Sequence, residues 1–150
     1  MSSEPCTREE FSFFHPLRVR WSEVDPQGIV FNPNYFVYAD IAMTEYMRAV
    51  GFPYPEGLQK LGSDLFAIRA EADFRGSAVY DDELELAARV EYIGSSSFRL
   101  LVGIFRKDEL LTQTRLTYVH ASMSEKKPSA VPDDFVGRVE AYERTRPVRK

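Results

Sequence analysis

The amino-acid sequence predicts an α+β domain in which one long buried helix packs against a curved antiparallel sheet. Three observations favour this fold class. Apolar and polar residues alternate over residues 14–21, helical start and stop signals bracket residues 32–51, and the apolar patterns between residues 66 and 123 have a period of two. Because the connections between the later strands are short, we expect antiparallel hairpins.

The first strand is expected where Leu17, Val19 and Trp21 alternate with polar side chains. Residues 1–12, which precede this strand, are expected to be flexible. After the strand, Asp25, Pro26 and Gly28 occupy the first, second and fourth positions, which these residue types prefer in a type I turn.

The central helix carries signals at both ends. Asn32 is a favoured N-cap, Pro33 is a favoured first helical residue, and Gly51 stands where a glycine commonly ends a helix. Apolar residues recur between them at steps of three and four, over a face wider than that of a surface helix: Tyr35, Phe36, Ala39, Ala42, Met43, Tyr46, Met47, Ala49 and Val50. We therefore expect this helix to be buried over much of its circumference.

The rest of the chain alternates with the strand period. Four further strands are expected, over residues 66–75, 84–92, 98–106 and 110–123. The polar residues 106–109 form the turn between the last two strands. A polar helix is expected over residues 132–146.

Composition and charge place residues 1–150 in a single globular domain. A chain of 150 residues can bury a core without disulfides or a structural metal. Cys6 is its single cysteine, which excludes an internal disulfide and favours a reducing compartment. No apolar run reaches the ~18 residues of a membrane span, and the first residues have no signal-peptide core, so a cytoplasmic protein is expected. The net charge of −4 argues against general nucleic-acid binding.

Several kinds of chemistry lack their motifs. The sequence has no G-x-S-x-G, no G-x-G-x-x-G and no P-loop motif. His15 and His120 lie far apart in the sequence, and with a single cysteine they argue against a zinc site. A hydrogen-bonded or solvated role is expected for His120. We expect no metal and no cofactor, so any catalysis rests on carboxylates and backbone groups.

The Asp25 turn and the helix start together have the parts of a site. Asp25 has two open roles, because it either shapes the turn or supplies a carboxylate to a reaction. The helix start that follows leaves the N–H groups of Asn32, Asn34 and Tyr35 at the positive end of the helix dipole. Such donors can hold a developing oxyanion. A carboxylate on the turn and these donors can together attack and polarise a carbonyl.

The run V-D-P-Q-G-I-V-F-N-P-N-Y, followed by Tyr38, Asp40 and Glu45, resembles the hotdog-fold acyl-CoA thioesterases of the 4-hydroxybenzoyl-CoA thioesterase-like group. The resemblance covers about residues 17–132, with weaker support from F-R-G-S-A-V-Y-D-D-E-L and G-S-S-S-F. It implies a helix wrapped by an antiparallel sheet and the pairing of two subunits into one continuous sheet, often as a dimer of dimers. It implies that Asp25 is the nucleophile or general base and that the backbone N–H of Asn32 polarises the thioester carbonyl.

The predicted activity is therefore hydrolysis of an acyl- or aroyl-CoA thioester to the free acid and CoA. Two departures from the family pattern stand out: Glu23 precedes Asp25 where many members have a second aspartate, and the family's basic cluster is replaced by Gly94-Ser95-Ser96. Scattered basic groups are expected to meet the CoA phosphates instead. The candidate substrate-binding residues are Gly28, Tyr35, Tyr38, Asp40, Arg75, Lys126 and Lys127, with core or hydrogen-bonding roles left open for Tyr38 and Asp40.

Two other functions stay open at this point. A non-catalytic acyl-CoA-binding protein would share the fold, although pure binding gains nothing from a carboxylate that faces an electrophile. An enoyl-thioester hydratase would need a histidine just after the Asn32-Pro33 pair, where this chain has Asn34.

A homo-oligomer is expected as well, with a tetramer favoured over a dimer. One helix covers only one face of the sheet, which would leave Leu101 and Phe105 on the other face to be buried by another copy.

Overall fold

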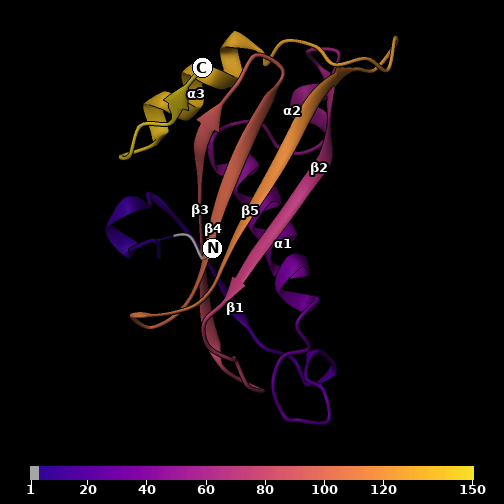
Figure 1. Ribbon diagram of the computed structural model, residues 1–150. Coiled ribbons are helices and arrows are strands. Elements are labelled where there is room, and N and C mark those ends of the chain that lie inside the picture. The colour runs from indigo at the N-terminus through magenta and orange to yellow at the C-terminus, as the bar shows by residue number, and fades with distance from the viewer. Residues whose placement is uncertain (1–3) are drawn as a thin grey trace.

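A computed structural model describes residues 4–150 as a helix laid across a curved sheet (Figure 1). The elements are η1 (Arg8–Glu10), β1 (Phe13–Arg18), η2 (Trp21–Glu23), α1 (Asn34–Ala49), α2 (Glu56–Gln59), β2 (Ser63–Phe74), β3 (Glu83–Ile93), β4 (Ser97–Arg106), β5 (Glu109–Ser122), α3 (Asp133–Tyr142) and β6 (Val148–Arg149). The strand order is β1-β3-β4-β5-β2, and β6 pairs with β3. All pairings are antiparallel except that of β6. The predicted α+β class is confirmed.

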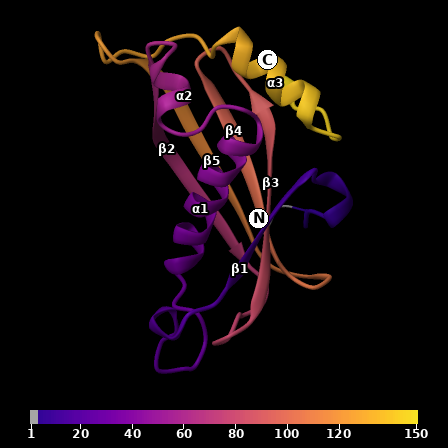
Figure 2. The same ribbon diagram turned by 180° about the vertical axis from the view of Figure 1, so that it is seen from behind.

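The central helix α1 crosses one face of the sheet, as the view from behind shows (Figure 2). Its C-terminal end is as predicted: Gly51 has a φ of 97°, and the N–H of Phe52 donates to the Met47 carbonyl at 2.9 Å. Its start differs, because α1 begins at Asn34 and no side chain caps it. The prediction that Asn32 is a side-chain N-cap is wrong.

The apolar core lies between α1 and the facing side of the sheet. Seven residues of α1 are buried there: Tyr35, Tyr38, Ala39, Ala42, Met43, Tyr46 and Met47. Alternate residues of β3 meet them, because successive side chains of a strand point to opposite faces: Leu84, Leu86, Ala88 and Val90. The expected burial of the helix over much of its circumference is confirmed.

The N-terminal segment packs on the other face of the sheet. Cys6 and Phe11 are buried against Leu101 and Phe105. This packing corrects the expectation of a flexible start for residues 4–12, while residues 1–3 lie outside the described part. Because Leu101 and Phe105 are covered by the chain itself, they no longer argue for a tetramer.

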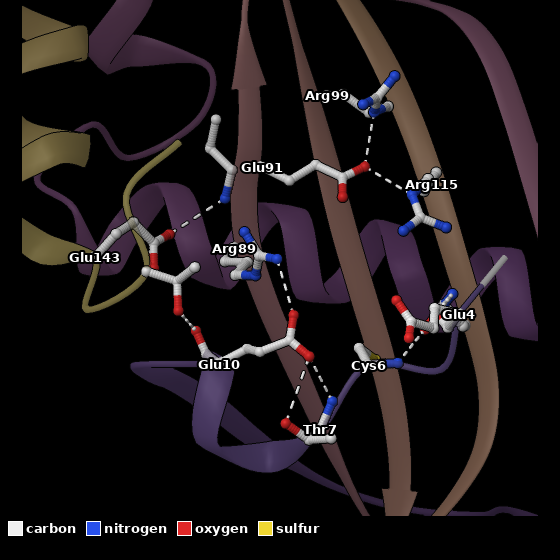
Figure 3. Close-up of polar contacts among 12 residues, drawn as sticks. Glu4, Cys6, Thr7, Glu10, Arg89, Glu91, Arg99, Arg115 and Glu143 are labelled. Atoms are coloured by element: carbon white, nitrogen blue, oxygen red, sulfur yellow. Dashed lines mark hydrogen bonds and ion pairs between the residues drawn. The ribbon is translucent and has the colours of Figure 1, made fainter. Parts of the chain in front are cut away.

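The same helix-free face carries a polar network (Figure 3). Glu91 accepts hydrogen bonds from Arg99 at 2.6 Å and from Arg115 at 2.7 Å. Glu10 of the N-terminal segment pairs with Arg89 at 2.9 Å. Ion pairs rather than apolar side chains therefore occupy much of this face.

Three element boundaries differ from the sequence prediction. β1 ends at Arg18, and Trp21 lies in the short helix η2 with its side chain exposed. β2 already begins at Ser63. The C-terminal helix stops at Tyr142, and the chain then forms β6.

None of the helices between residues 4 and 150 is both long enough and apolar enough to cross a membrane.

Candidate functional site

Asp25 sits on a small hairpin that joins η2 to α1. Val24 bridges Val30, and the N–H of Asp25 donates to the Ile29 carbonyl at 2.9 Å. The predicted turn is confirmed, since the N–H of Gly28 donates to the Asp25 carbonyl at 2.8 Å and Gly28 has a φ of 80°. Gly28 is thus a turn residue at the position that needs a left-handed backbone.

The Asp25 side chain serves the turn and still has an oxygen to spare. Its Oδ1 accepts the Gln27 N–H at 2.8 Å, while Oδ2 makes no hydrogen bond within residues 4–150. The residue is half-buried. The turn role therefore leaves one carboxylate oxygen available to a reaction.

Of the three backbone donors expected at the helix start, one remains. The Asn34 N–H donates to the Phe31 carbonyl at 2.8 Å, and the Tyr35 N–H donates to the Asn32 carbonyl at 3.1 Å. The Asn32 N–H has no acceptor in the described part of the chain, and Asn32 is exposed. Only this N–H can receive an oxyanion without breaking a bond of the fold.

Tyr35 and Tyr38, two of the predicted substrate-binding residues, are hydrogen-bonded inside the fold. The Tyr35 hydroxyl accepts the Ala78 N–H at 3.0 Å, which ties residues 75–82 to α1. The Tyr38 hydroxyl donates to Glu23 at 2.9 Å, and burial together with this carboxylate raises the pKa of Tyr38. Both rings are buried in the single chain, and substrate contact by either residue stays a prediction.

Glu23 is a buried carboxylate that sequence reasoning did not place in the site. Burial by itself would raise the pKa of Glu23, but hydrogen bonds from the Arg20 N–H, the Tyr38 hydroxyl and the Arg20 guanidinium outweigh it and lower that pKa. The residue is therefore ionised and held in place directly before the Asp25 hairpin. Its position two residues before Asp25 was the only signal in the sequence.

Exposed apolar side chains surround the Asp25 hairpin. The hairpin is bridged to residues 75–82 through Ile29 and Val79, and the Val30 N–H donates to the Ala78 carbonyl at 2.9 Å. Four apolar side chains of these segments are exposed: Trp21, Phe31, Val79 and Tyr80. We call these four residues the apolar rim. Sequence reasoning misses it, because the alternating pattern places Trp21 in a strand.

The other predicted ligand contacts are spread over the molecule. Asp40 is exposed on α1. Arg75 follows the end of β2, whereas Lys126 and Lys127 follow β5 beside the beginning of β2. β2 has 12 residues, and a strand rises by roughly 3.3 Å per residue. Most of the length of β2 therefore separates Arg75 from the two lysines. One chain does not bring Arg75 together with the two lysines.

His120 is a buried residue of β5, beside the edge strand β2. Its Nδ1 lies 3.1 Å from the Ser63 hydroxyl oxygen, so the expected hydrogen-bonded role is confirmed. Burial lowers the pKa of His120 to about 4. Between residues 4 and 150, no three histidine, cysteine, aspartate or glutamate side chains gather in a way that could hold a metal ion.

Comparisons with known proteins bear on the family and the fold. Residues 27–113 match the thioesterase superfamily. The chain is 27% identical over 124 residues to a protein of Aquifex aeolicus (strain VF5) that is provisionally named an esterase, a match that covers 83% of this chain and 94% of that one. It is 23% identical over 124 residues to the acyl-CoA thioesterase YbgC of Haemophilus influenzae, covering 83% of this chain and 90% of that one.

Solved structures share the fold. A thioesterase from Thermus thermophilus, complexed with coenzyme A and Zn, has a TM-score of 0.79 at 24% identity, over 93% of this chain and 99% of that one. The hotdog fold that the sequence resemblance implied is confirmed.

Proposed function

The chain belongs to the thioesterase superfamily, and we propose that it hydrolyses an acyl- or aroyl-CoA thioester to the free acid and CoA with Asp25 as the catalytic carboxylate. The observation that carries this proposal is the pairing of a free carboxylate oxygen on Asp25 with the free N–H of Asn32 at the two ends of one hairpin. The Asp25 carboxylate accepts a backbone N–H, and the oxyanion donor is itself a backbone group.

The reaction then follows from these two groups. As a general base, the Asp25 carboxylate takes a proton from water while the water oxygen attacks the thioester carbonyl carbon. The Asn32 N–H donates to the oxyanion of the tetrahedral intermediate. The carbon–sulfur bond breaks, and the thiolate of CoA leaves and receives the proton. As a nucleophile, Asp25 would instead form an anhydride that water hydrolyses.

The substrate class is supported by the relatives and by the site itself. One relative is named an acyl-CoA thioesterase, and one structural neighbour holds coenzyme A. The apolar rim gives the acyl group or the pantetheine arm an apolar surface next to Asp25. Asp40, Tyr35 and Tyr38 would shape the site indirectly, through the helix.

A second copy of the chain would complete the site. β2 is an edge strand of 12 residues whose outer backbone groups have no strand beside them in residues 4–150. Phe66, Ile68 and Phe74 are exposed along it, and Phe66 and Ile68 line a groove of about 390 Å³. Antiparallel pairing of two β2 strands would bury these side chains and extend the sheet.

Such pairing would also gather the basic groups. In an antiparallel pair, the beginning of one β2 lies beside the end of the other. Arg75 of one copy would then approach Lys126 and Lys127 of the second copy, which gives the CoA phosphates a composite basic site. A cytoplasmic location belongs to this proposal too, and the buried thiol of Cys6 is compatible with it.

Release of free thiol tests the proposal against its alternatives. Short, long and aromatic acyl-CoAs are offered to the protein, and saturable thiol release is expected from at least one class. Binding of acyl-CoA without thiol release would instead indicate a binding protein. A 2-enoyl-CoA is offered as well, and loss of its enoyl absorbance without thiol release would indicate a hydratase. The chain lacks the histidine that this activity needs, because Asn34 stands there and its side chain donates to the Glu23 carbonyl at 2.9 Å.

A further inference from the structure

Glu23 connects the hairpin that carries Asp25 to the central helix through both its side chain and its backbone. The side-chain Oε1 accepts the Tyr38 hydroxyl at 2.9 Å and the Arg20 N–H at 2.8 Å. The Arg20 guanidinium meets Oε2 at 3.1 Å. Tyr38 belongs to α1, so the side chain of Glu23 fixes the first strand of the hairpin against the helix.

The backbone carbonyl of the same residue holds the other end of the hairpin. It accepts the Phe31 N–H at 2.9 Å and the side-chain amide of Asn34 at 2.9 Å. Phe31 directly precedes the free N–H of Asn32, and Asn34 is the first residue of α1. One residue thus bonds the chain both where it enters the Asp25 turn and where it leaves it for the oxyanion donor.

We propose that Glu23 is a positioning residue that fixes the Asp25 carboxylate relative to the Asn32 N–H, because its side chain bonds the start of their hairpin to Tyr38 of α1 and its carbonyl bonds Phe31 and Asn34 at the other end. This inference rests on the proposed function for its effect on turnover, whereas the hairpin geometry it describes does not. A carboxylate is needed because one atom, Oε1, accepts two donors while Oε2 faces a guanidinium. Replacing it with an amide would set an N–H₂ group against Arg20.

The sharpest test removes one atom, the Tyr38 hydroxyl oxygen, in Tyr38→Phe. The ring stays packed, but Glu23 loses the bond that joins it to α1. We expect kcat to fall by ~10-fold or more with KM nearly unchanged, because a small displacement of a reacting group lowers turnover steeply. Glu23→Gln should show the same split, because the amide set against Arg20 displaces the side chain that accepts the Tyr38 hydroxyl. The double variant should lose less than the product of the two single losses, since both changes act on one network.

Tyr46→Phe is the matched control. Tyr46 lies on the same helix, is 0% exposed like Tyr38, and donates its hydroxyl to a different buried carboxylate, that of Glu143. Its loss should lower the melting temperature while kcat stays at the wild-type value. A merely structural role for Tyr38 predicts the same behaviour in both variants.

Hydrogen–deuterium exchange separates this inference from the proposed function. Amides of residues 24–32 should exchange faster in Tyr38→Phe than in the wild type or in Tyr46→Phe, whether or not thiol release is seen. Wild-type protein that releases no thiol, with this exchange difference present, overturns the proposed function and keeps the positioning of the hairpin. Wild-type exchange and wild-type kcat in both Tyr38→Phe and Glu23→Gln overturn the positioning role, even if Asp25→Asn abolishes thiol release.

Discussion

The hydroxyl of Tyr46 donates a hydrogen bond of 2.5 Å to the carboxylate of Glu143, which joins the central helix to the residue that follows α3. The N–H of Val90 donates to the same oxygen, Oε2, at 3.2 Å. Oε1 is buried and has no partner in the described part of the chain. Burial raises the pKa of Glu143 to about 7, although both hydrogen bonds oppose this. A carboxyl group whose neutral form is favoured by burial therefore joins the C-terminal helix to α1.

This burial predicts a pH-dependent stability. Between pH 4.5 and about 7 the folded chain keeps a proton on Glu143 that the unfolded chain has lost. The contribution of Glu143 to the free energy of unfolding should then fall as the pH rises through this window, by on the order of 3 kcal/mol. Glu143→Gln removes the titration and should be more stable than the wild type at pH 8. Urea unfolding of both proteins between pH 4 and 8 measures the difference, and parallel curves would contradict the assignment.

His120 predicts the opposite slope in nearly the same window. Burial lowers the pKa of His120 from 6.5 to about 4, so between these pH values the unfolded chain binds a proton on His120 that the folded chain does not bind. The free energy of unfolding should fall as the pH drops from about 6.5 to 4, again by on the order of 3 kcal/mol. His120→Asn, which keeps a polar group near Ser63, should lose this dependence. In the wild type, the contribution of Glu143 to the free energy of unfolding has the opposite slope. The quantity to measure is therefore the difference in this free energy between the wild type and His120→Asn at each pH.

The elements of the fold that could be predicted from the sequence have a local periodic pattern of apolar residues. The buried face of α1 and the paired strands carry apolar residues at the helix or strand period, and these signals need no knowledge of the rest of the chain. The packing of Cys6 and Phe11 on Leu101 and Phe105 has no such signal, since the two segments are distant in the sequence and the first contains no periodic pattern. Sequence patterns alone therefore do not predict what covers the helix-free face of the sheet.

The candidate site likewise has features that the sequence predicts and features that it does not. The Asp25 turn could be predicted because its residue types encode it. The start of the helix could not, because the chain turns between Phe31 and Asn34 first and the helix starts two residues after Asn32. The role of Glu23 depends on Tyr38, a contact that exists only once the hairpin has folded onto α1.

The open edge of β2 predicts an assembly that a single substitution breaks. Ile68→Arg places a charge on this strand and should shift the protein toward monomers at micromolar concentration. Val148→Arg is the control, because Val148 has the same 63% exposure as Ile68 but lies on β6. Light scattering distinguishes monomer, dimer and tetramer. A wild-type monomer would contradict the assembly, and a tetramer would need a contact other than Leu101 and Phe105.

The side chain of Asn32 should matter little, since it caps no helix and the proposed donor is its backbone N–H. Asn32→Ala is expected to change the free energy of unfolding by no more than about 0.5 kcal/mol and to keep most of the turnover. Asn32→Pro removes the N–H and should lower kcat by roughly 10²-fold or more. Circular dichroism checks that the fold survives. Complete inactivation by alanine in a folded protein would make the side chain itself chemical.

The charge of Asp25 is the feature on which the proposed activity depends most. Asp25→Asn keeps an oxygen that can accept the Gln27 N–H, so the turn and the melting temperature should be preserved. It removes the negative charge needed for attack or proton abstraction, and kcat on the best acyl-CoA should fall by ~10²–10³-fold. Thiol release and thermal unfolding are measured on the same preparation.

Asp108→Asn is the control for Asp25→Asn, because Asp108 is an exposed aspartate in the turn between β4 and β5 and takes no part in the Asp25 hairpin. It should keep wild-type turnover. Glu23→Gln cannot serve as this control, since the Glu23 carboxylate holds the hairpin in place. If Asp25 only shapes the turn, the asparagine variant should match both the wild type and Asp108→Asn, because asparagine suits the first turn position equally well. Near wild-type turnover in a folded Asp25→Asn protein would therefore remove Asp25 from the chemistry and leave it as a turn residue.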